Sequence, residues 1–251
     1  MHRFFVEPAL LTEEHVVLGS PIAHQICHVL RLQPGARILL LDGEGQQAEA
    51  VLEGVAGREV RAFLLSKGHA PGEPRVQVTL YQSLLRNQRF EWVLQKGTEL
   101  GVTAFVPVLS ERCVARPADV VRKRARWQAI VREAAEQSER GRLPSVALPV
   151  AFPDACEDTT DKGPTLMAWE ERKGVTLRRA LSETMLHDGE GERSLGLFIG
   201  PEGGFTAAEA ALASAHGIRL VDLGPRVLRA ETAAIAALAA LSYALGEWDV
   251  P

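Results

Sequence analysis

The sequence has few cysteines and no long apolar run. These two features argue against a disulfide-bonded protein and against a membrane-spanning one. Only Cys27, Cys113 and Cys156 occur among its 251 residues, and they lie far apart. This spacing predicts neither a disulfide framework nor a zinc site. No apolar stretch reaches the roughly 20 residues that a membrane-spanning helix needs, and residues 1–15 lack the layout of a signal peptide. We therefore expect a cytoplasmic protein that works without a membrane.

Several common active-site motifs are also missing. The stretch GPEGGF at residues 200–205 has the wrong spacing for the dinucleotide motif G-x-G-x-x-G, which belongs at the first strand-to-helix turn of a nucleotide-binding domain. There is no P-loop ending in Gly-Lys-Ser/Thr and no G-x-S-x-G nucleophile elbow. No cluster of His, Cys and Asp suggests a metal ion. These absences disfavour nicotinamide, P-loop, serine-hydrolase and metal chemistry.

The composition is that of an ordinary soluble globular protein, with 46% apolar and 24% charged residues. A chain of this length can bury a sizeable core without disulfides or metals. The formal net charge of −4 provides no general attraction to nucleic acid. A local basic patch remains compatible with that balance, because a phosphate backbone meets only the surface that it touches.

The hydrophobic pattern predicts two domains. Residues 1–70 combine short strand-like segments, one helical segment at 21–32 and a hairpin whose turn is Asp42–Gly45, which together suggest a small β-barrel. The stretch KGHAPGEPR at 67–75 has two prolines and two glycines, so the linker is expected there. In residues 75–251, near-continuous apolar strands alternate with helices. This pattern favours an α/β domain whose parallel sheet is covered on both faces.

The first unusual bend is LFIGPEGGFTAAE, at residues 197–209. Gly200, Gly203 and Gly204 permit backbone angles that other residues avoid, and they let a ligand approach the chain closely. Thr206 and Glu209 have the spacing of a capping box that begins the next helix. Because ligands of open parallel sheets bind at the carboxyl ends of the strands, this loop is a candidate ligand site. The alternative is a plain tight connection.

The second bend, LVDLGPRVLRAETAAIAALAAL, covers residues 220–241. The helix is expected to begin at Arg226, and no Ser, Thr, Asp or Asn stands there as a cap, so the first amides of that helix need other partners. A polar or anionic group of a ligand can supply them. The helix is rich in alanine, which favours a helix and permits very close packing. A buried helix in a crowded core explains the alanines equally well, and both interpretations can hold together.

The two bends together resemble the C-terminal signature of the SPOUT methyltransferases, and more narrowly of the RsmE family of 16S rRNA uracil-N3 methyltransferases. HVLRLQPGARILLLDGEG resembles that family's N-terminal barrel, and FEWVLQKGTELGV, PVLSERC and EQSERGRLP are similar to its middle segments. The resemblance implies a PUA-like RNA-binding β-barrel at 1–70. It also implies a SPOUT α/β domain with a deep trefoil knot at 75–251. True knots are nearly absent from proteins. To form one, a chain segment must pass through a loop, and thin glycine loops and a slim alanine helix would suit that passage.

The resemblance further implies S-adenosyl-L-methionine as the cofactor, held among the loops that follow TLMAW, LFIG and LVDLG. The residues expected to line this site are Leu166, Met167, Ile199, Gly200, Pro201, Gly203, Gly204, Leu223, Gly224, Leu228, Arg229, Thr232 and Ala233.

Methylation at N3 of uracil requires removal of an imide proton. The negative charge that is left on the ring then spreads over the two flanking carbonyl oxygens. A site for this reaction needs correct positioning, a donor to the developing anion and a base. The candidates are Arg229 as the donor, and Glu231 and Glu202 as base, as partner of Arg229 or as counter-charge to the sulfonium. Ordinary ion pairs are the alternative role for all three.

The family resemblance also implies RNA contacts and a homodimer with the site near its interface. Candidate RNA-binding residues are His24, His28, Arg31, Arg37, Lys96, Arg112 and Arg140, although a solvated surface is their alternative role. The expected partner is 16S rRNA or the assembled small ribosomal subunit. Two rival functions stay open: a SPOUT methyltransferase acting on tRNA or a ribose hydroxyl, and a non-catalytic RNA-binding protein whose knot is only structural.

Overall fold

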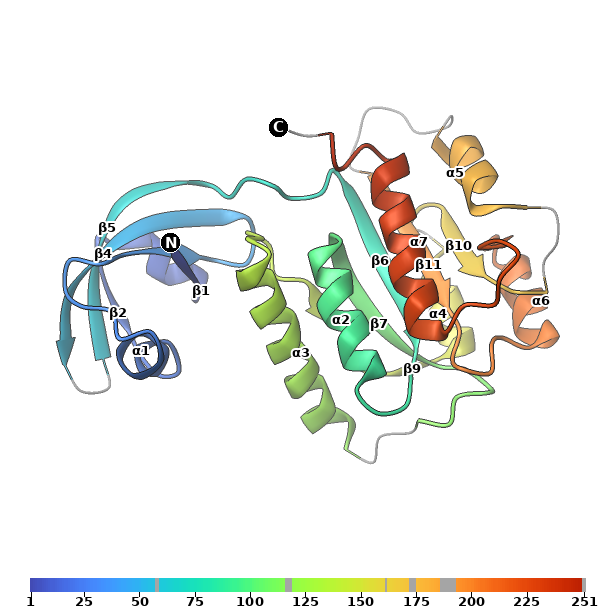
Figure 1. Ribbon diagram of the computed structural model, residues 1–251, viewed down its shortest axis with the longest axis horizontal. Helices are drawn as coiled ribbons and strands as arrows, with labels where there is room; N and C mark the ends of the chain where they lie inside the picture. The colour runs from blue at the N-terminus through green and yellow to red at the C-terminus, as the bar shows by residue number, and fades with distance from the viewer. Residues whose placement is uncertain (57–58, 116–118, 161, 172–174, 186–192, 250–251) are drawn as a thin grey trace. The chain divides into compact units, whose positions relative to one another are not determined.

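The computed structural model describes residues 1–56, 59–115, 119–160, 162–171, 175–185 and 193–249 (Figure 1). The chain forms two compact units. The first unit joins Met1–Glu73 with Ala135–Leu143, and the second joins Pro74–Ala134 with Pro144–Pro251. These units differ from the predicted ranges 1–70 and 75–251 chiefly by the segment 135–143, which belongs to the first unit.

The first unit contains a five-stranded mixed sheet with the order β1-β3-β4-β5-β2. Its strands are β1 (His2–Phe5), β2 (His15–Leu18), β3 (Arg37–Leu41), β4 (Gln46–Ala56) and β5 (Glu59–His69). The β1–β3 pair is parallel and the others are antiparallel. A 3-10 helix covers Pro8–Thr12, and α1 (Ile22–His24) continues as a π-helical turn over Gln25–Val29. The hairpin turn at Asp42–Gly45 is confirmed, whereas closure of this sheet into a barrel stays a prediction.

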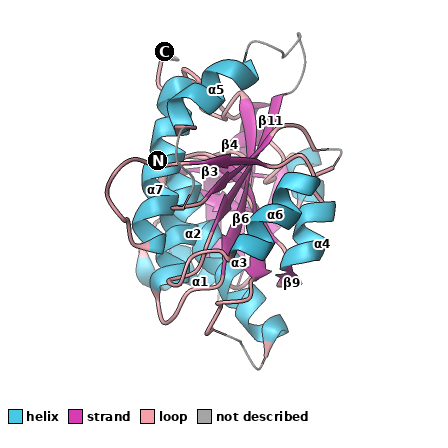
Figure 2. Cartoon of the chain, turned by 90° about the vertical axis from the view of Figure 1, so that its right-hand side faces the viewer, coloured by secondary structure: helices cyan, strands magenta, loops and turns pink. Residues whose placement is uncertain are grey.

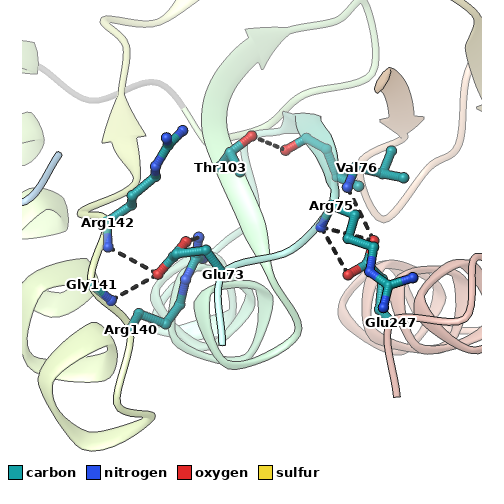
Figure 3. A network of polar contacts seen from close by, with 9 residues as sticks. Glu73, Arg75, Val76, Thr103, Arg140, Gly141, Arg142 and Glu247 are labelled. Atoms are coloured by element: carbon teal, nitrogen blue, oxygen red, sulfur yellow. Dashed lines mark hydrogen bonds and ion pairs between the residues drawn. The ribbon is translucent and has the colours of Figure 1, made fainter. Parts of the chain in front are cut away.

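The segment 135–143 is attached to the first unit by apolar and charged contacts. Ala135 packs with Phe5, Leu39 and Leu41 in a small core cluster. The Arg140 guanidinium donates to Glu73 at 2.9 Å, and the amides of Gly141 and Arg142 donate to the other Glu73 oxygen (Figure 3). The sequence pattern placed this segment in the second domain at 75–251, because hydrophobic periodicity does not show which core a helix end joins.

The second unit contains a parallel sheet with the order β12-β10-β11-β6-β7-β8, and β9 also pairs with β7. The strands are β6 (Val76–Ser83), β7 (Val102–Leu109), β8 (Ser145–Val146), β9 (Val150–Ala151), β10 (Thr165–Ala168), β11 (Arg193–Ile199) and β12 (Arg219–Val221). Every pair that the structure describes in this sheet is parallel. The predicted α/β domain with a parallel sheet is thereby confirmed.

Helices cover both faces of this sheet (Figure 2). They are α2 (Arg89–Glu99), α3 (Val120–Gln137), α4 (Phe152–Glu157), α5 (Leu177–Met185), α6 (Ala207–Ala215) and α7 (Ala230–Ala244). Helices α2 and α7 pack together on one face, and α4 and α6 pack on the other. Under α4 and α6, the rings of Tyr81 and Phe198 stack at 4.3 Å in a fully buried core.

The chain end beyond α7 returns to the beginning of this unit. The Glu247 carboxylate accepts the backbone amides of Arg75 and Val76 at 3.0–3.1 Å (Figure 3). Those amides precede and begin β6, so a side chain near the C-terminus holds the first strand of the sheet. Among the described residues, no helix is long and apolar enough to cross a membrane.

Candidate functional site

Three loops meet at the carboxyl edge of the parallel sheet and enclose a cavity of about 500 Å³. The loops follow β10, β11 and β12, and they lie side by side because these strands are neighbours in the order β12-β10-β11. The lining comprises Arg89, Ala233 and residues 168–170, 199–202, 204–205 and 222–231. This is the edge at which parallel sheets bind ligands.

The glycines of the loop after β11 are needed because the chain turns back tightly on itself. A Cβ at Gly200 would lie 3.2 Å from the Phe205 ring and 3.3 Å from the Gly204 backbone. Gly204 has φ +65°, and a Cβ there would meet the Glu170 carboxylate at 3.1 Å. The Trp169 indole donates to the Phe205 carbonyl at 3.3 Å, which ties this loop to the loop after β10.

The predicted capping box at the start of α6 is confirmed. The Thr206 hydroxyl accepts from the Glu209 amide, and the Glu209 carboxylate accepts from the Thr206 amide. The second Glu209 oxygen accepts the Glu111 amide at 2.8 Å. Glu209 is 8% exposed, so one buried carboxylate fixes both the end of the glycine loop and the loop after β7.

The loop after β12 ends at an uncapped helix. The Asp222 carboxylate accepts the Gly224 amide at 2.7 Å, and Gly224 has φ +110°. Arg229 is the N-cap of α7 with extended backbone, and none of the described side chains caps this helix. The helix therefore starts at Ala230 and not at residue 226, and its first turn faces the cavity with amides that a ligand can use.

Charged side chains of both signs line the cavity. They are the arginines Arg89, Arg226 and Arg229 and the carboxylates Glu170, Glu202, Asp222 and Glu231. Glu231 is 8% exposed, and its Oε2 atom has no hydrogen-bond partner among the described residues. The Arg89 guanidinium lies 3.6 Å from Glu202 and 3.6 Å from Glu231. With one more negative than positive side chain, the cavity suits a ligand that carries positive charge.

Most residues predicted to line a cofactor site do line this cavity: Ile199, Gly200, Pro201, Gly204, Leu223, Gly224, Leu228, Arg229 and Ala233. Leu166 and Met167 lie inside β10 and are fully buried in the sheet, so Ala168, Trp169 and Glu170 form that wall instead. Gly203 lines a neighbouring cavity, and Thr232 is exposed outside the lining.

Sequence reasoning missed Arg89 at the first position of α2. The signal was its place at the start of the helix that follows β6, because the carboxyl end of β6 lies at the same edge of the sheet. Trp169 and Glu170 were missed for a different reason. They follow the strand residues that the prediction chose, and the pattern did not show where β10 ends.

The structure places the predicted RNA-binding residues in different environments. His24 and His28 are exposed with ring centroids 4.9 Å apart, Arg31 is exposed with φ +52°, and Arg37 is exposed and pairs with Glu49. Lys96 pairs with Glu99, and Arg112 donates to the Gly203 carbonyl at 2.8 Å.

Arg140 corrects one of these expectations. It is 4% exposed and holds Glu73. A buried guanidinium that is already paired does not present its charge to RNA, so we assign it a structural role.

Comparison with known proteins identifies the family. A model of the RNA methyltransferase domain matches residues 72–242, and a model of the RNA methyltransferase PUA domain matches residues 19–65. The ribosomal RNA small subunit methyltransferase E of Bacillus subtilis is 32% identical over 97% of this chain and 96% of its own length. The chain belongs to the ribosomal RNA small subunit methyltransferase E family. Its Synechocystis member is 39% identical over 97% of this chain and 78% of its own length.

Solved structures of similar proteins agree with the fold. The ribosomal RNA small subunit methyltransferase E of Neisseria gonorrhoeae, solved bound to S-adenosyl methionine, superposes with a TM-score of 0.84 at 34% identity and 97% coverage of both chains. A methyltransferase structure from Legionella pneumophila, in complex with the same cofactor, gives 0.82 at 29% identity, with 96% of this chain and 97% of that chain covered. The family assignment from the glycine bends is therefore confirmed.

Proposed function

We propose that this chain transfers a methyl group from S-adenosyl-L-methionine to N3 of a specific uridine in 16S rRNA. The observation that carries the proposal is the cavity among the loops after β10, β11 and β12. The family to which this chain belongs includes a member whose crystal structure was solved with this cofactor bound. The relatives' name supports ribosomal RNA of the small subunit as the substrate.

The residues present fit the cofactor. The uncapped start of α7 and the loop before it offer backbone amides, and the glycines at 200 and 204 let a ligand lie against the chain. The buried Glu231 oxygen without a partner and the excess of carboxylates suit a cationic ligand. The loops at 199–204 and 223–228 would hold the cofactor, and Glu202 and Glu231 would face its positive charge. When bound, the cofactor supplies an electrophilic methyl group.

The chain's own residues supply the remaining chemistry. The N3 proton passes to a carboxylate, either Glu231 or Glu202, which both line the cavity. The N3 electron pair then forms the bond to the methyl carbon, while the carbon–sulfur bond breaks and its electrons stay on sulfur. Arg229 donates to a uracil carbonyl and stabilises the negative charge that forms there, a contribution typically worth about 3–4 kcal/mol. The cavity walls hold both reactants near attack distance.

The RNA contacts are proposed on basic side chains of both units, of which Lys96 is half-buried and the others are exposed. His24, His28, Arg31 and Arg37 would bind RNA from the first unit, and Lys96 and Arg112 from the second. The target base must leave its stack to reach a methyl donor held in a cavity.

The substrate is 16S rRNA, free or in the small subunit. We place the reaction in the cytoplasm, where thiols stay reduced, since Cys27, Cys113 and Cys156 are all free.

A homodimer is proposed through the outer face of α7. A groove of about 750 Å³ between α5 and α7 is lined mainly by apolar residues, among them Leu181, Ala236, Ala240 and Tyr243, and Tyr243 is 73% exposed. The groove shares Leu223, Gly224 and Leu228 with the cofactor cavity, so a second copy would cover a wall of the site. Ala240→Glu should convert the dimer to a monomer in light scattering, and a wild-type monomer at micromolar concentration contradicts the proposal.

A deep trefoil knot is proposed for the region that ends in α7. The neighbouring positions of β10, β11 and β12, the tight glycine loop and the small alanine side chains of α7 support it. In single-molecule pulling from both ends, a knotted chain should extend less than its residue count allows. Full extension to about 3.3–3.6 Å per residue would contradict the knot.

The decisive experiment measures transfer of tritium from the labelled cofactor to small ribosomal subunits that lack the modification, followed by mapping of the labelled base. Label at uridine N3 is the expected result. Label on a ribose or on tRNA would favour another methyltransferase activity. The absence of both transfer and calorimetric cofactor binding at millimolar concentration would favour a non-catalytic RNA-binding protein.

A further inference from the structure

A second cavity lies directly beside the proposed cofactor site. It measures about 520 Å³, and its lining includes Arg86, Asn87, Arg89, Arg112, Glu202 and Gly203. Two of these residues, Arg89 and Glu202, also line the cofactor cavity. The two cavities therefore share a wall, and that wall is an arginine next to a carboxylate.

The shared arginine is held more loosely by its two glutamates than several other arginines are by theirs. Arg89 lies 3.6 Å from Glu202 and 3.6 Å from Glu231, beyond hydrogen-bond distance, and its side chain is 41% exposed. In six other arginine–glutamate ion pairs, the nitrogen and oxygen are 2.9 Å apart or closer. Arg89 stands between two carboxylates with its N–H donors still available.

Two neighbouring groups in the second cavity are already held by hydrogen bonds. The Arg112 guanidinium donates to the Gly203 carbonyl at 2.8 Å, and a Cβ at Gly203 would lie 3.2 Å from the Arg112 side chain. The Arg86 amide donates to Glu202 at 3.0 Å and fixes that carboxylate. Arg89 is thus the cationic side chain on the shared wall that can turn to a ligand without breaking a hydrogen bond.

We propose that the second cavity holds the flipped target pyrimidine and that Arg89 is a catalytic residue that donates to a ring carbonyl beside N3. This inference rests on the proposed function. As N3 loses its proton to Glu202, which lines both cavities, the negative charge spreads to the two flanking carbonyl oxygens, and a guanidinium with free donors stabilises it. Where the two cavities meet, the N3 electron pair then forms the bond to the methyl carbon, and the carbon–sulfur bond breaks with its electrons left on sulfur. Charge-assisted donors of this kind discriminate the anion from the neutral base.

The test compares Arg89→Ala and Arg89→Lys with the wild-type chain in the tritium-transfer assay. For Arg89→Ala, kcat should fall roughly 100-fold or more, with the cofactor Kd from calorimetry within about threefold of wild type. Arg89→Lys should keep a measurable part of kcat because it retains the charge. Added guanidinium at millimolar concentration should restore Arg89→Ala at least about tenfold, which a purely structural role would not allow.

Arg126→Ala is the matched control. It also removes an ion pair to α2, since Arg126 holds Glu91 at 2.6 and 2.9 Å, and kcat should stay within about twofold. A wild-type kcat in Arg89→Ala, or equal losses of kcat and cofactor affinity, overturns the role of Arg89. If Arg89→Ala does not fold, Arg89→Lys with an unchanged kcat and pH–rate profile overturns it as well. Absence of transfer by the wild-type chain would instead refute the proposed function.

Discussion

Gly204 illustrates how a single hydrogen in place of a side chain shapes the proposed cofactor cavity. It adopts a left-handed conformation at a point where any Cβ would press on Glu170. Both effects act on the same loop, yet they have different consequences. Left-handed strain costs about 1–2 kcal/mol of stability, whereas the contact with Glu170 changes the shape of the cavity wall.

We predict that Gly204→Ala weakens cofactor binding by at least about tenfold, because the added methyl group displaces the Glu170 carboxylate from the lining. Calorimetric titration with the cofactor measures this. Gly217→Ala is the control, since Gly217 has φ +76° but nothing within 4 Å of its Cβ position. The control should lose similar stability and keep its cofactor affinity. If both variants bind the cofactor equally, crowding at Gly204 does not shape the site.

Arg229 allows a second prediction at this scale. Its side chain is exposed at the N-cap of α7 and lines the cavity. Arg229→Ala should lower kcat in the tritium-transfer assay by about 100-fold while changing the cofactor Kd by less than about threefold, because a donor to the developing anion acts mainly in the transition state. Parallel losses in turnover and cofactor affinity would show that Arg229 binds the cofactor instead.

Strand β6 and helix α4 bring two acidic groups into the core under the sheet. Burial raises the pKa of Cys156 to about 12, with the nearby Glu209 carboxylate adding to the effect. Burial also raises the pKa of Tyr81 above its usual range, and its hydroxyl donates to Asp158 at 2.9 Å. Both groups therefore stay protonated in the folded chain at pH values at which they ionise in the unfolded chain.

The pH dependence of stability follows from that difference. Both folded pKa values lie above the unfolded values of about 8.5 for cysteine and about 10 for tyrosine, so the stabilisation is complete below pH 8.5 and declines as pH rises toward 12. We predict that the Tm falls between pH 8.5 and 10.5 in circular dichroism melts. Tyr81→Phe should show a shallower decline above pH 10, and a flat wild-type profile would contradict the assignment.

An element could be predicted from sequence when the residues that determine it lie close together in the chain. The capping box at Thr206 and Glu209 is set by residues three apart, and the pattern found it. The buried parallel strands were recognisable because both faces carry apolar residues. The start of α7 was misplaced by four residues because Gly224-Pro225 leads into a loop whose shape depends on its neighbours. Arg89 was missed because its role depends on two carboxylates more than 100 residues away in sequence.

The first unit depends on a segment supplied from far along the chain. Arg140 and its pair with Glu73 connect residues 135–143 to the end of the segment Met1–Glu73. Arg140→Ala should lower the free energy of unfolding by about 3–5 kcal/mol, since it leaves a largely buried carboxylate without its charged partner. Arg37→Ala, which breaks the exposed pair with Glu49, should cost about 1 kcal/mol or less. Urea denaturation measures both, and similar values would show that the Arg140 pair is not structural.

The family and the two-part organisation were accessible from sequence because the glycine bends and the linker are short, distinctive patterns. The sequence did not show that residues 135–143 return to the first unit, because Ala135 and Arg140 look like ordinary helix residues. Their destination is decided by the apolar cluster of Phe5, Leu39 and Leu41 and by the Glu73 carboxylate. No local spacing encodes such partners.

The carboxylate of Glu247 on the amides of Arg75 and Val76 fastens the segment after α7 to the start of β6. A change in one segment is therefore felt by the other, although 171 residues separate Glu247 from Val76 in the sequence. Loss of the Glu247 carboxylate would leave both amides without this acceptor, so the sheet would fray at the first residues of its central strand while α7 kept its place.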